Sequence, residues 1–217
     1  MKDAIINQLG QLGVIPIIVM RDVEDAVPVA EALVGAGLPT LEVTYRTAAA
    51  GQSLERIRGR FPELLLGAGT VLTLDQAKEA RDCGAQFIIS PGLDPKMVEY
   101  CLGNDLVPLP GVSSPTEIQT AVGLGLTALK LFPAELLGGI RYLESVVGPF
   151  PMVRFIPTGG VHTGNLETYL SRSEVLACAG TWIARKDWLQ EKRFDLIERA
   201  AAHALEIVRG VRARSRS

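Results

Sequence analysis

A lysine lies near the centre of the apolar run 128–132, where the sequence reads Ala-Leu-Lys-Leu-Phe. An ammonium group in such a run is costly to bury unless it is paired or loses its proton. A lysine that has lost its proton is a nucleophile towards carbonyl carbon. Lys130 is therefore a candidate nucleophile, and the alternative is a core lysine whose charge is simply satisfied.

A carboxylate lies in a second apolar run, between Leu41 and Val43. Because side chains alternate along a strand, Glu42, Thr44 and Arg46 are expected to share one face. If that face points inward, Glu42 meets Lys130. The pair then either shuttles protons in a dry pocket or forms a buried ion pair that fixes the strand register.

Arg46 follows at the end of the same run. Its planar guanidinium is suited to bind a substrate carboxylate through two parallel hydrogen bonds. The alternative is an arginine at the rim, paired with a surface acid.

Lys130, Glu42 and Arg46 can act together only if the fold brings them close to one another. The chain alternates short apolar runs with longer amphipathic segments. That alternation predicts parallel strands connected by helices. Eight strands are expected, at residues 15–20, 40–45, 64–67, 86–90, 106–109, 128–132, 154–157 and 175–179. The pattern predicts the α/β class and one (β/α)8 TIM barrel over residues 1–217, with an extra N-terminal leader helix at 1–13 and a frayed basic tail at 209–217.

In a barrel of this kind the active site lies where the strands end, so the polar and glycine-rich strand ends are the candidate site. The first strand is followed by Met20-Arg21-Asp22-Val23 and not by a glycine-rich fingerprint, which disfavours a dinucleotide-binding fold.

Composition narrows the class of protein. The chain of 217 residues is 47% hydrophobic and 21% charged, with a formal net charge of -2. This balance gives no electrostatic case for binding to nucleic acid or to an anionic membrane, and no apolar run is long enough for a membrane span.

Three scattered cysteines and the lack of a signal-peptide pattern predict buried free thiols and a cytoplasmic protein. Two isolated histidines, His162 and His203, predict no metal cluster.

Six motifs in this order give the sequence a recognisable signature. They are Glu42-Val43-Thr44-Tyr45-Arg46-Thr47, Gly67-Ala68-Gly69-Thr70-Val71-Leu72, Ile89-Ser90-Pro91-Gly92, Pro110-Gly111-Val112-Ser113, Lys130-Leu131-Phe132-Pro133-Ala134-Glu135 and Pro157-Thr158-Gly159-Gly160-Val161. Together they resemble the bifunctional 2-keto-3-deoxy-6-phosphogluconate (KDPG) aldolase / 4-hydroxy-2-oxoglutarate (KHG) aldolase family, from about residue 15 to residue 188.

The resemblance implies a class I pyruvate aldolase of the Entner–Doudoroff pathway that acts on a phosphorylated keto acid, needs no cofactor or metal, and assembles as a homotrimer. It implies that Lys130 forms a Schiff base and that Glu42 is the general acid/base. The remaining roles that it implies are binding of the pyruvyl carboxylate by Arg46 and Thr70, walls formed by Pro91 and Phe132, and binding of the distal phosphate by Gly159, Gly160 and Thr181.

Two positions depart from the family pattern. His162 stands where a small residue is usual, and it is expected either to be a surface or loop-capping histidine or to contact the phosphate. Thr181 stands where the family tends to have serine, so the hydroxyl is kept and a methyl group is added. Two rival functions remain, which are an aldolase for the galactonate epimer and a non-catalytic barrel that binds a phosphate ligand. A metal-dependent aldolase is disfavoured because the sequence offers no histidine and carboxylate cluster.

Overall fold

The computed structural model describes residues 2–214, in which short parallel strands alternate with helices. The strands are β1 (Val14–Ile18), β2 (Thr40–Thr44), β3 (Leu65–Gly69), β4 (Phe87–Ile89), β5 (Val107–Leu109), β6 (Gly111–Val112), β7 (Ala128–Leu131), β8 (Arg154–Pro157) and β9 (Cys178–Gly180). The helices are α1 (Lys2–Leu12), α2 (Ala26–Gly35), α3 (Ala50–Arg60), α4 (Leu74–Asp82), α5 (Pro95–Gly103), α6 (Pro115–Gly123), α7 (Ala134–Leu137), α8 (Ile140–Val147), α9 (Thr163–Leu170), α10 (Lys186–Gln190) and α11 (Phe194–Arg214), with a 3-10 turn, η1, at Val23–Asp25.

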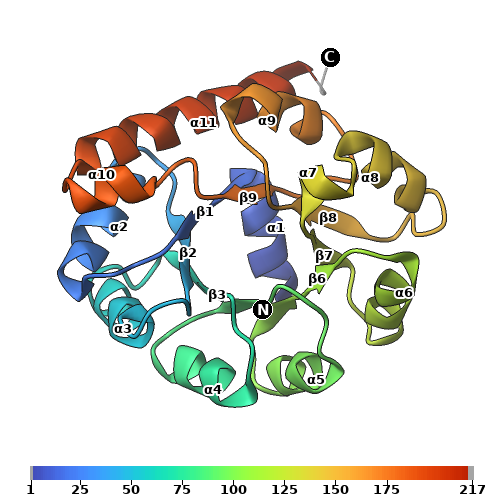
Figure 1. The fold of residues 1–217 in the computed structure, drawn as a ribbon, viewed down its shortest axis with the longest axis horizontal. Coiled ribbons are helices and arrows are strands. Elements are labelled where there is room, and N and C mark those ends of the chain that lie inside the picture. Colours follow the sequence, from blue (N-terminus) through green and yellow to red (C-terminus); the bar gives the residue numbers. More distant parts are fainter. Residues whose placement is uncertain (1, 215–217) are drawn as a thin grey trace.

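The strands form a curled parallel sheet with most of the helices outside it (Figure 1). One part has the order β5-β4-β3-β2-β1-β9 and the other has the order β6-β7-β8. Isolated parallel bridges join Phe155 to Val175 and Thr158 to Ala179. The carboxyl ends of the strands therefore lie at one end of the sheet, which is where the site residues were predicted.

The strands are buried almost throughout, which explains why they read as continuous apolar runs. All residues of β1, β2, β3 and β7 are buried. One hydrophobic cluster fills the space between the sheet and the outer helices, and a second fills its interior. A parallel sheet covered on both faces has no need for the polar alternation of an exposed strand.

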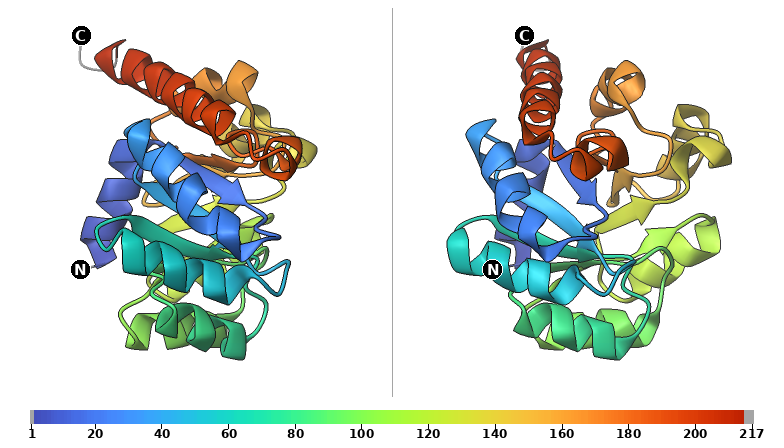
Figure 2. Two further views of the ribbon diagram at one scale, coloured as in Figure 1. Left: turned by 90° about the vertical axis from the view of Figure 1, so that its left-hand side faces the viewer. Right: turned by 60° about the vertical axis from the view of Figure 1, so that its left-hand side comes forward.

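Helix α1 lies within the predicted leader segment at 1–13, and it covers the end of the sheet where the strands begin (Figure 2). Its buried residues Ile5 and Leu9 join the interior cluster together with Ile15 and Leu65. The apolar face of α1 thus closes the interior at the end opposite to the predicted site.

Side-chain caps fix where several outer helices begin. Thr73, Asp94 and Ser114 each have extended backbone and accept a hydrogen bond from an amide in the first turn. Such caps satisfy amide groups that have no partner inside the helix. Asp22 caps the 3-10 turn that precedes α2 in the same way.

Two predictions about the last part of the chain are corrected by the structure. The final strand is β9, Cys178–Gly180, so it starts later than the predicted 175–179 and ends one residue beyond it. The tail predicted to fray from residue 209 continues α11 as far as Arg214, and the rest of that prediction lies outside the described residues. Arg212 donates hydrogen bonds to the carbonyls of Gly10 and Gln11, which anchors this last turn to α1.

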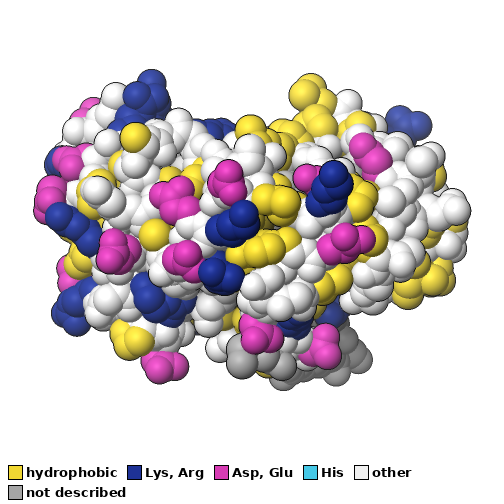
Figure 3. Space-filling model, turned by 90° about the horizontal axis from the view of Figure 1, so that it is seen from below, with side chains coloured by type: hydrophobic (Ala, Val, Ile, Leu, Met, Phe, Trp, Pro, Cys, Tyr) yellow, Lys and Arg dark blue, Asp and Glu magenta, His cyan; other side chains and the backbone are white. Residues whose placement is uncertain are grey.

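The surface seen from below the view of Figure 1 carries lysine and arginine side chains among aspartate and glutamate side chains, with apolar side chains gathered between them (Figure 3). Of the helices that the structure describes, none combines the length and the apolar character needed to cross a membrane.

Candidate active site

Lys130 is buried on β7, with 5% of its surface exposed. Its Nζ lies 4.9 Å from the centre of the Phe132 ring, a distance at which a cation is attracted to the ring face. Burial lowers the pKa of Lys130; the charge of Glu42 opposes this shift and the charge of Arg46 adds to it. At a given pH, a larger fraction of Lys130 is therefore in the neutral amine form than of an exposed lysine.

Glu42 is buried on β2, with 1% of its surface exposed. Burial raises the pKa of Glu42, and the nearby charges of Lys130 and Arg46 oppose that shift. Among residues 2–214, its Oε2 has no hydrogen-bond partner, and no ion pair joins Glu42 to Lys130. A buried carboxylate oxygen without a partner is rare and is typical of catalytic sites, which disfavours a purely structural ion pair.

Two glycines of β3 make room for side chains of neighbouring strands. A Cβ atom at Gly69 would lie 1.7 Å from Oε1 of Glu42, and one at Gly67 would lie 1.9 Å from the ring of Phe87. Contacts this short do not occur between real atoms, so any larger residue at either position must displace its neighbour. The lack of a side chain at Gly69 therefore leaves the space that the Glu42 carboxylate occupies.

Arg46 and Thr70 are brought together from the ends of β2 and β3. Nε of Arg46 donates a hydrogen bond of 3.1 Å to Oγ1 of Thr70. Thr70 has a φ of 54°, which is unfavourable for a β-branched residue and is found mainly at functional sites. The part of the chain that the structure describes offers Arg46 no carboxylate partner, which disfavours the alternative of a rim ion pair.

A cavity of about 200 Å³ opens beside Lys130, and we call it the lysine cavity. Six predicted site residues line it: Arg46, Lys130, Phe132, Gly159, Gly160 and Thr181. Four lining residues were not predicted: Ile17, Thr158, Val161 and Gly180. The strand-end position of Thr158, within a motif already recognised, is the signal that could have identified it.

Pro91 lies next to β6, the strand that pairs with β7, on which Lys130 stands. Gly111 is the register partner of Lys130 on β6, and a Cβ atom at Gly111 would lie 2.1 Å from the carbonyl oxygen of Pro91. The structure thus brings Pro91 within one strand of the lysine, although Pro91 is not among the residues that line the lysine cavity. Its predicted role as a pocket wall stays a prediction.

The turn after β8 holds two of the predicted residues in backbone conformations that favour glycine. Gly159 and Gly160 have φ angles of 93° and 83°. The turn is fixed from the α7 side, where the amides of Ala134 and Glu135 donate to the carbonyls of Thr158 and Gly159, at 2.8 and 3.1 Å. A side chain at Gly160 would collide with Glu135, since its Cβ would lie 2.5 Å from that of Glu135.

A second cavity of about 570 Å³, which we call the distal cavity, begins at the same turn. It shares Gly160, Val161 and Thr181 with the lysine cavity and extends to the start of α10. Near this turn its walls are formed by the backbone of Gly160 and the hydroxyl group of Thr181. Backbone amides and hydroxyl groups can both bind an oxyanion.

His162, which also lines the distal cavity, caps α9. Its Nδ1 accepts a hydrogen bond of 3.0 Å from the Gly164 amide, and its own amide donates one of 2.8 Å to Oδ1 of Asn165. The expectation of a loop-capping histidine is confirmed. Nδ1 is occupied by this cap, so only the opposite nitrogen of the ring is left for a ligand.

Among the described residues, no group of three or more histidine, cysteine, aspartate or glutamate side chains is arranged to hold a metal ion. Cys83, Cys101 and Cys178 are free thiols. Cys101 and Cys178 are buried, and burial raises the pKa of the Cys101 thiol to about 11. These two thiols are poor nucleophiles in this environment.

Comparison with known proteins gives consistent results. The model of the KDPG and KHG aldolase family matches residues 5–200. A protein of Treponema pallidum (strain Nichols) named 2-dehydro-3-deoxy-phosphogluconate aldolase is 42% identical over 204 residues, which cover 94% of this chain and 97% of that protein. A KHG/KDPG aldolase of Escherichia coli (strain K12) is 40% identical over 193 residues, which cover 89% and 91% of the two chains.

Among solved structures, the KDPG aldolase of Legionella pneumophila superimposes with a TM-score of 0.89 and 37% sequence identity, over 92% of this chain and 97% of that one. That crystal structure holds pyruvate, captured at low pH as a covalent carbinolamine intermediate.

Proposed function

Because the chain belongs to the KDPG and KHG aldolase family, we propose that Lys130 is its imine-forming lysine and Glu42 its general acid/base. The protein is a class I aldolase, a carbon–carbon lyase of the Entner–Doudoroff pathway, and it cleaves KDPG to pyruvate and glyceraldehyde 3-phosphate. KHG is its second substrate, cleaved to pyruvate and glyoxylate. The observation that carries the assignment of residues is a buried lysine near a buried carboxylate with no ion pair between them.

The reaction needs a free amine first. Nζ of Lys130 attacks the C2 carbonyl carbon to give a carbinolamine, which loses water to form a protonated imine. Glu42 then removes the proton of the C4 hydroxyl group as the bond between C3 and C4 breaks, and the electron pair moves into an enamine. Protonation at C3 and hydrolysis of the imine release pyruvate and restore the lysine.

The lowered pKa of Lys130 and the raised pKa of Glu42 suit these two roles. A lysine of ordinary pKa would be almost fully protonated near neutral pH and could not attack. A carboxylate of ordinary pKa would be a poor acid for returning a proton near neutral pH.

The binding roles follow the same geometry. Arg46, held by Thr70, binds the pyruvyl carboxylate and so fixes which end of the substrate meets the lysine. Phe132 and Pro91 form walls, and Gly159, Gly160 and Thr181 bind the distal phosphate at the entrance to the distal cavity. Support for the last assignment comes from Gly160 and Thr181, which line both cavities, and from Gly159, which precedes Gly160 in the same turn and lines the lysine cavity.

Reductive trapping tests the central assignment. Incubation with pyruvate and borohydride is expected to add the mass of a reduced pyruvyl group to the peptide that contains Lys130, as measured by peptide mass spectrometry. A label on another lysine, or none, would remove Lys130 from its role. Unchanged activity in the presence of a chelator would argue against the metal-dependent alternative.

Substrate assays separate the rival functions. Pyruvate release, followed with a coupled dehydrogenase, is compared for KDPG, KHG and the galactonate epimer of KDPG. Preference for the galactonate epimer would reassign the substrate, while tight binding of a phosphorylated ligand without any trapping would indicate a non-catalytic binding barrel.

Three broader features belong to the same proposal. Closure of the sheet into a (β/α)8 barrel is supported by the bridges between the β8 and β9 regions and by β5 and β6, which are separated only by Pro110. A homotrimer is expected from the family resemblance, and light scattering should give three times the chain mass. A cytoplasmic location is expected from the sequence and is tested by cell fractionation.

A further inference from the structure

The distal cavity continues the path that starts at Lys130. It meets the lysine cavity at Gly160, Val161 and Thr181 and then runs along the start of α10. A substrate joined to Lys130 through C2 therefore directs its far end towards α10. The side chains of that region are in a position to select what the far end carries.

Two cations and one carboxylate line the distal cavity near α10. Arg185 is committed to that carboxylate, because its Nε and Nη2 donate to the two oxygens of Asp187 at 3.0 and 2.8 Å. Lys186 makes no side-chain hydrogen bond or ion pair within the described residues. The charge of Arg185 is thus largely neutralised, and that of Lys186 is available.

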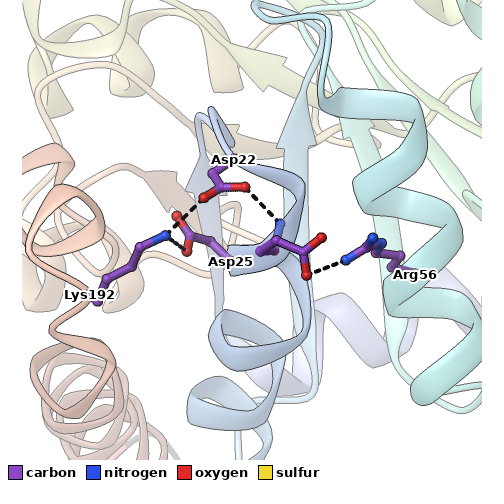
Figure 4. Close-up of polar contacts among 5 residues, drawn as sticks. Asp22, Asp25, Arg56 and Lys192 are labelled. Carbon is purple, nitrogen blue, oxygen red and sulfur yellow. Dashed lines mark hydrogen bonds and ion pairs between the residues drawn. The ribbon is translucent and has the colours of Figure 1, made fainter.

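A third, smaller cavity of about 170 Å³ adjoins the distal cavity, and the two share Val19, Lys186 and Leu189. Lys192, which lines this third cavity, is also paired with carboxylates. Figure 4 shows Lys192 between Asp22 and Asp25, with its Nζ 3.0 Å from Oδ2 of Asp22 and in contact with Oδ1 of Asp25. Arg21 lines this third cavity but not the distal one. Lys186 is therefore the cation that reaches both cavities without a carboxylate partner among the described residues.

We propose that Lys186 is a specificity-determining residue that supplies the positive charge for the distal phosphate of the substrate. This inference rests on the proposed function of the site. The glycine turn and Thr181 offer neutral donors, whereas a phosphate dianion gains more from a charged one. A lysine also suits a solvent-exposed phosphate group, because its ammonium is a compact charge on a long, flexible side chain and can bind the phosphate from more than one direction. An unphosphorylated substrate has no group for Lys186 to bind.

The test compares Lys186→Ala with Lys96→Ala, which removes the same charge from an exposed position at the start of another outer helix. For Lys186→Ala, the KM for KDPG is expected to rise about 10-fold, the effect of losing one exposed charge-assisted hydrogen bond. Its kcat should stay within about twofold. The KM for KHG, which has no phosphate, should not change, and Lys186→Arg should restore most of the affinity for KDPG.

Inhibition by inorganic phosphate gives a second readout. Phosphate should compete with KDPG in the wild-type protein and in Lys96→Ala, and about 10-fold more weakly in Lys186→Ala. An unchanged KM for KDPG in Lys186→Ala, or an equal rise in the KM for KHG, would overturn the proposal.

Phosphate binding by Lys186 can be tested even if the protein has no aldolase activity. If the wild-type protein cleaved none of the candidate substrates, the proposed function would fail, and an NMR titration with inorganic phosphate would still test Lys186. Equal phosphate affinity of the wild-type protein and Lys186→Ala in that titration would exclude Lys186 as the phosphate-binding cation.

Discussion

The carboxylate of Glu42 lies directly against the backbone of Gly69, so that a Cβ atom at position 69 would be 1.7 Å from Oε1 of Glu42. The two residues are on adjacent strands, with Glu42 paired to Gly67 and Thr44 paired to Gly69. The glycine on β3 thus gives the carboxylate a place on the inner face of the sheet that no other residue would leave open. A strand glycine is usually unfavourable, and here its lack of a side chain defines the geometry of the site.

Gly69→Ala is expected to displace the Glu42 carboxylate and to reduce kcat about 100-fold, since a misplacement of about 1 Å can cost that much in a catalytic group. The added methyl should also lower the free energy of unfolding by about 1–3 kcal/mol. Steady-state turnover and urea unfolding measure the two effects. The control is Gly59→Ala on α3, where nothing lies within 4 Å of the added atom. Wild-type kcat in Gly69→Ala would show that the carboxylate does not need this position.

Glu42→Gln keeps the shape of the side chain and removes its ability to transfer a proton. Turnover of KDPG should fall by about 100- to 10,000-fold, which is the usual contribution of a general acid/base. Trapping of pyruvate by borohydride should continue at a reduced rate, because the amine of Lys130 is still present. A variant with normal turnover would exclude Glu42 as the acid/base, and one that cannot be trapped at all would give it a role in imine formation as well.

The pH dependence of trapping reports the charge environment of Lys130. With excess cyanoborohydride, the labelling rate should rise with pH while the amine loses its proton, and it should level off below pH 10.5, since burial lowers the pKa of Lys130 from that value. Glu42 opposes the shift, so Glu42→Gln should lower the pKa of Lys130 further and move the plateau to lower pH. Arg46 adds to the shift, so Arg46→Met should move the plateau to higher pH. Shifts in the opposite directions would contradict this electrostatic account.

Thr70→Val removes the hydroxyl that accepts the hydrogen bond from Nε of Arg46. The KM for KDPG and for KHG should both rise roughly fivefold, because about 1 kcal/mol of positioning is lost from Arg46, the residue proposed to bind the pyruvyl carboxylate that both substrates share. Thr70→Ser keeps the hydroxyl and is the matched control. If the two variants had the same KM values, the hydroxyl of Thr70 would have no part in holding Arg46.

His162→Ala should lower the free energy of unfolding by about 1 kcal/mol, because the cap on the Gly164 amide is lost. His162→Asn provides a shorter side chain that also caps helices well and should recover most of this stability. Thermal unfolding measures the difference. The KM for KDPG is expected to stay at the wild-type value in both variants. A rise in that KM without a rise for KHG would show that the histidine contacts the phosphate in addition to capping α9.

Much of this protein was predictable from local sequence. Continuous apolar runs predicted buried parallel strands, because a strand covered on both faces must be apolar on both, and β2, β7 and β8 appear where those runs lie. Lys130 and Glu42 could be selected in the same way, since a charged residue in such a run is costly and needs a reason.

Other features depended on the tertiary structure. The course of the chain after residue 175 was predicted less well, because β9 is short and is defined by its pairing with β1 rather than by its own pattern. Residues 209–214 continue α11, and Arg212 in this segment reaches the carbonyls at the end of α1, a contact between the two ends of the described chain that no local pattern contains.

The sequence by itself determined most of the buried strands and the residue types that stand at their ends, because burial on one or both faces imposes a local periodicity. Only the tertiary structure decided which of those residues meet. The place of Glu42 beside Gly69 depends on the register of two strands, the contact of Arg46 with Thr70 depends on a left-handed backbone at Thr70, and the position of Lys186 depends on how α10 lies beside the turn after β8. Such contacts join residues far apart in the chain, and their geometry is fixed by packing, which local sequence patterns do not encode.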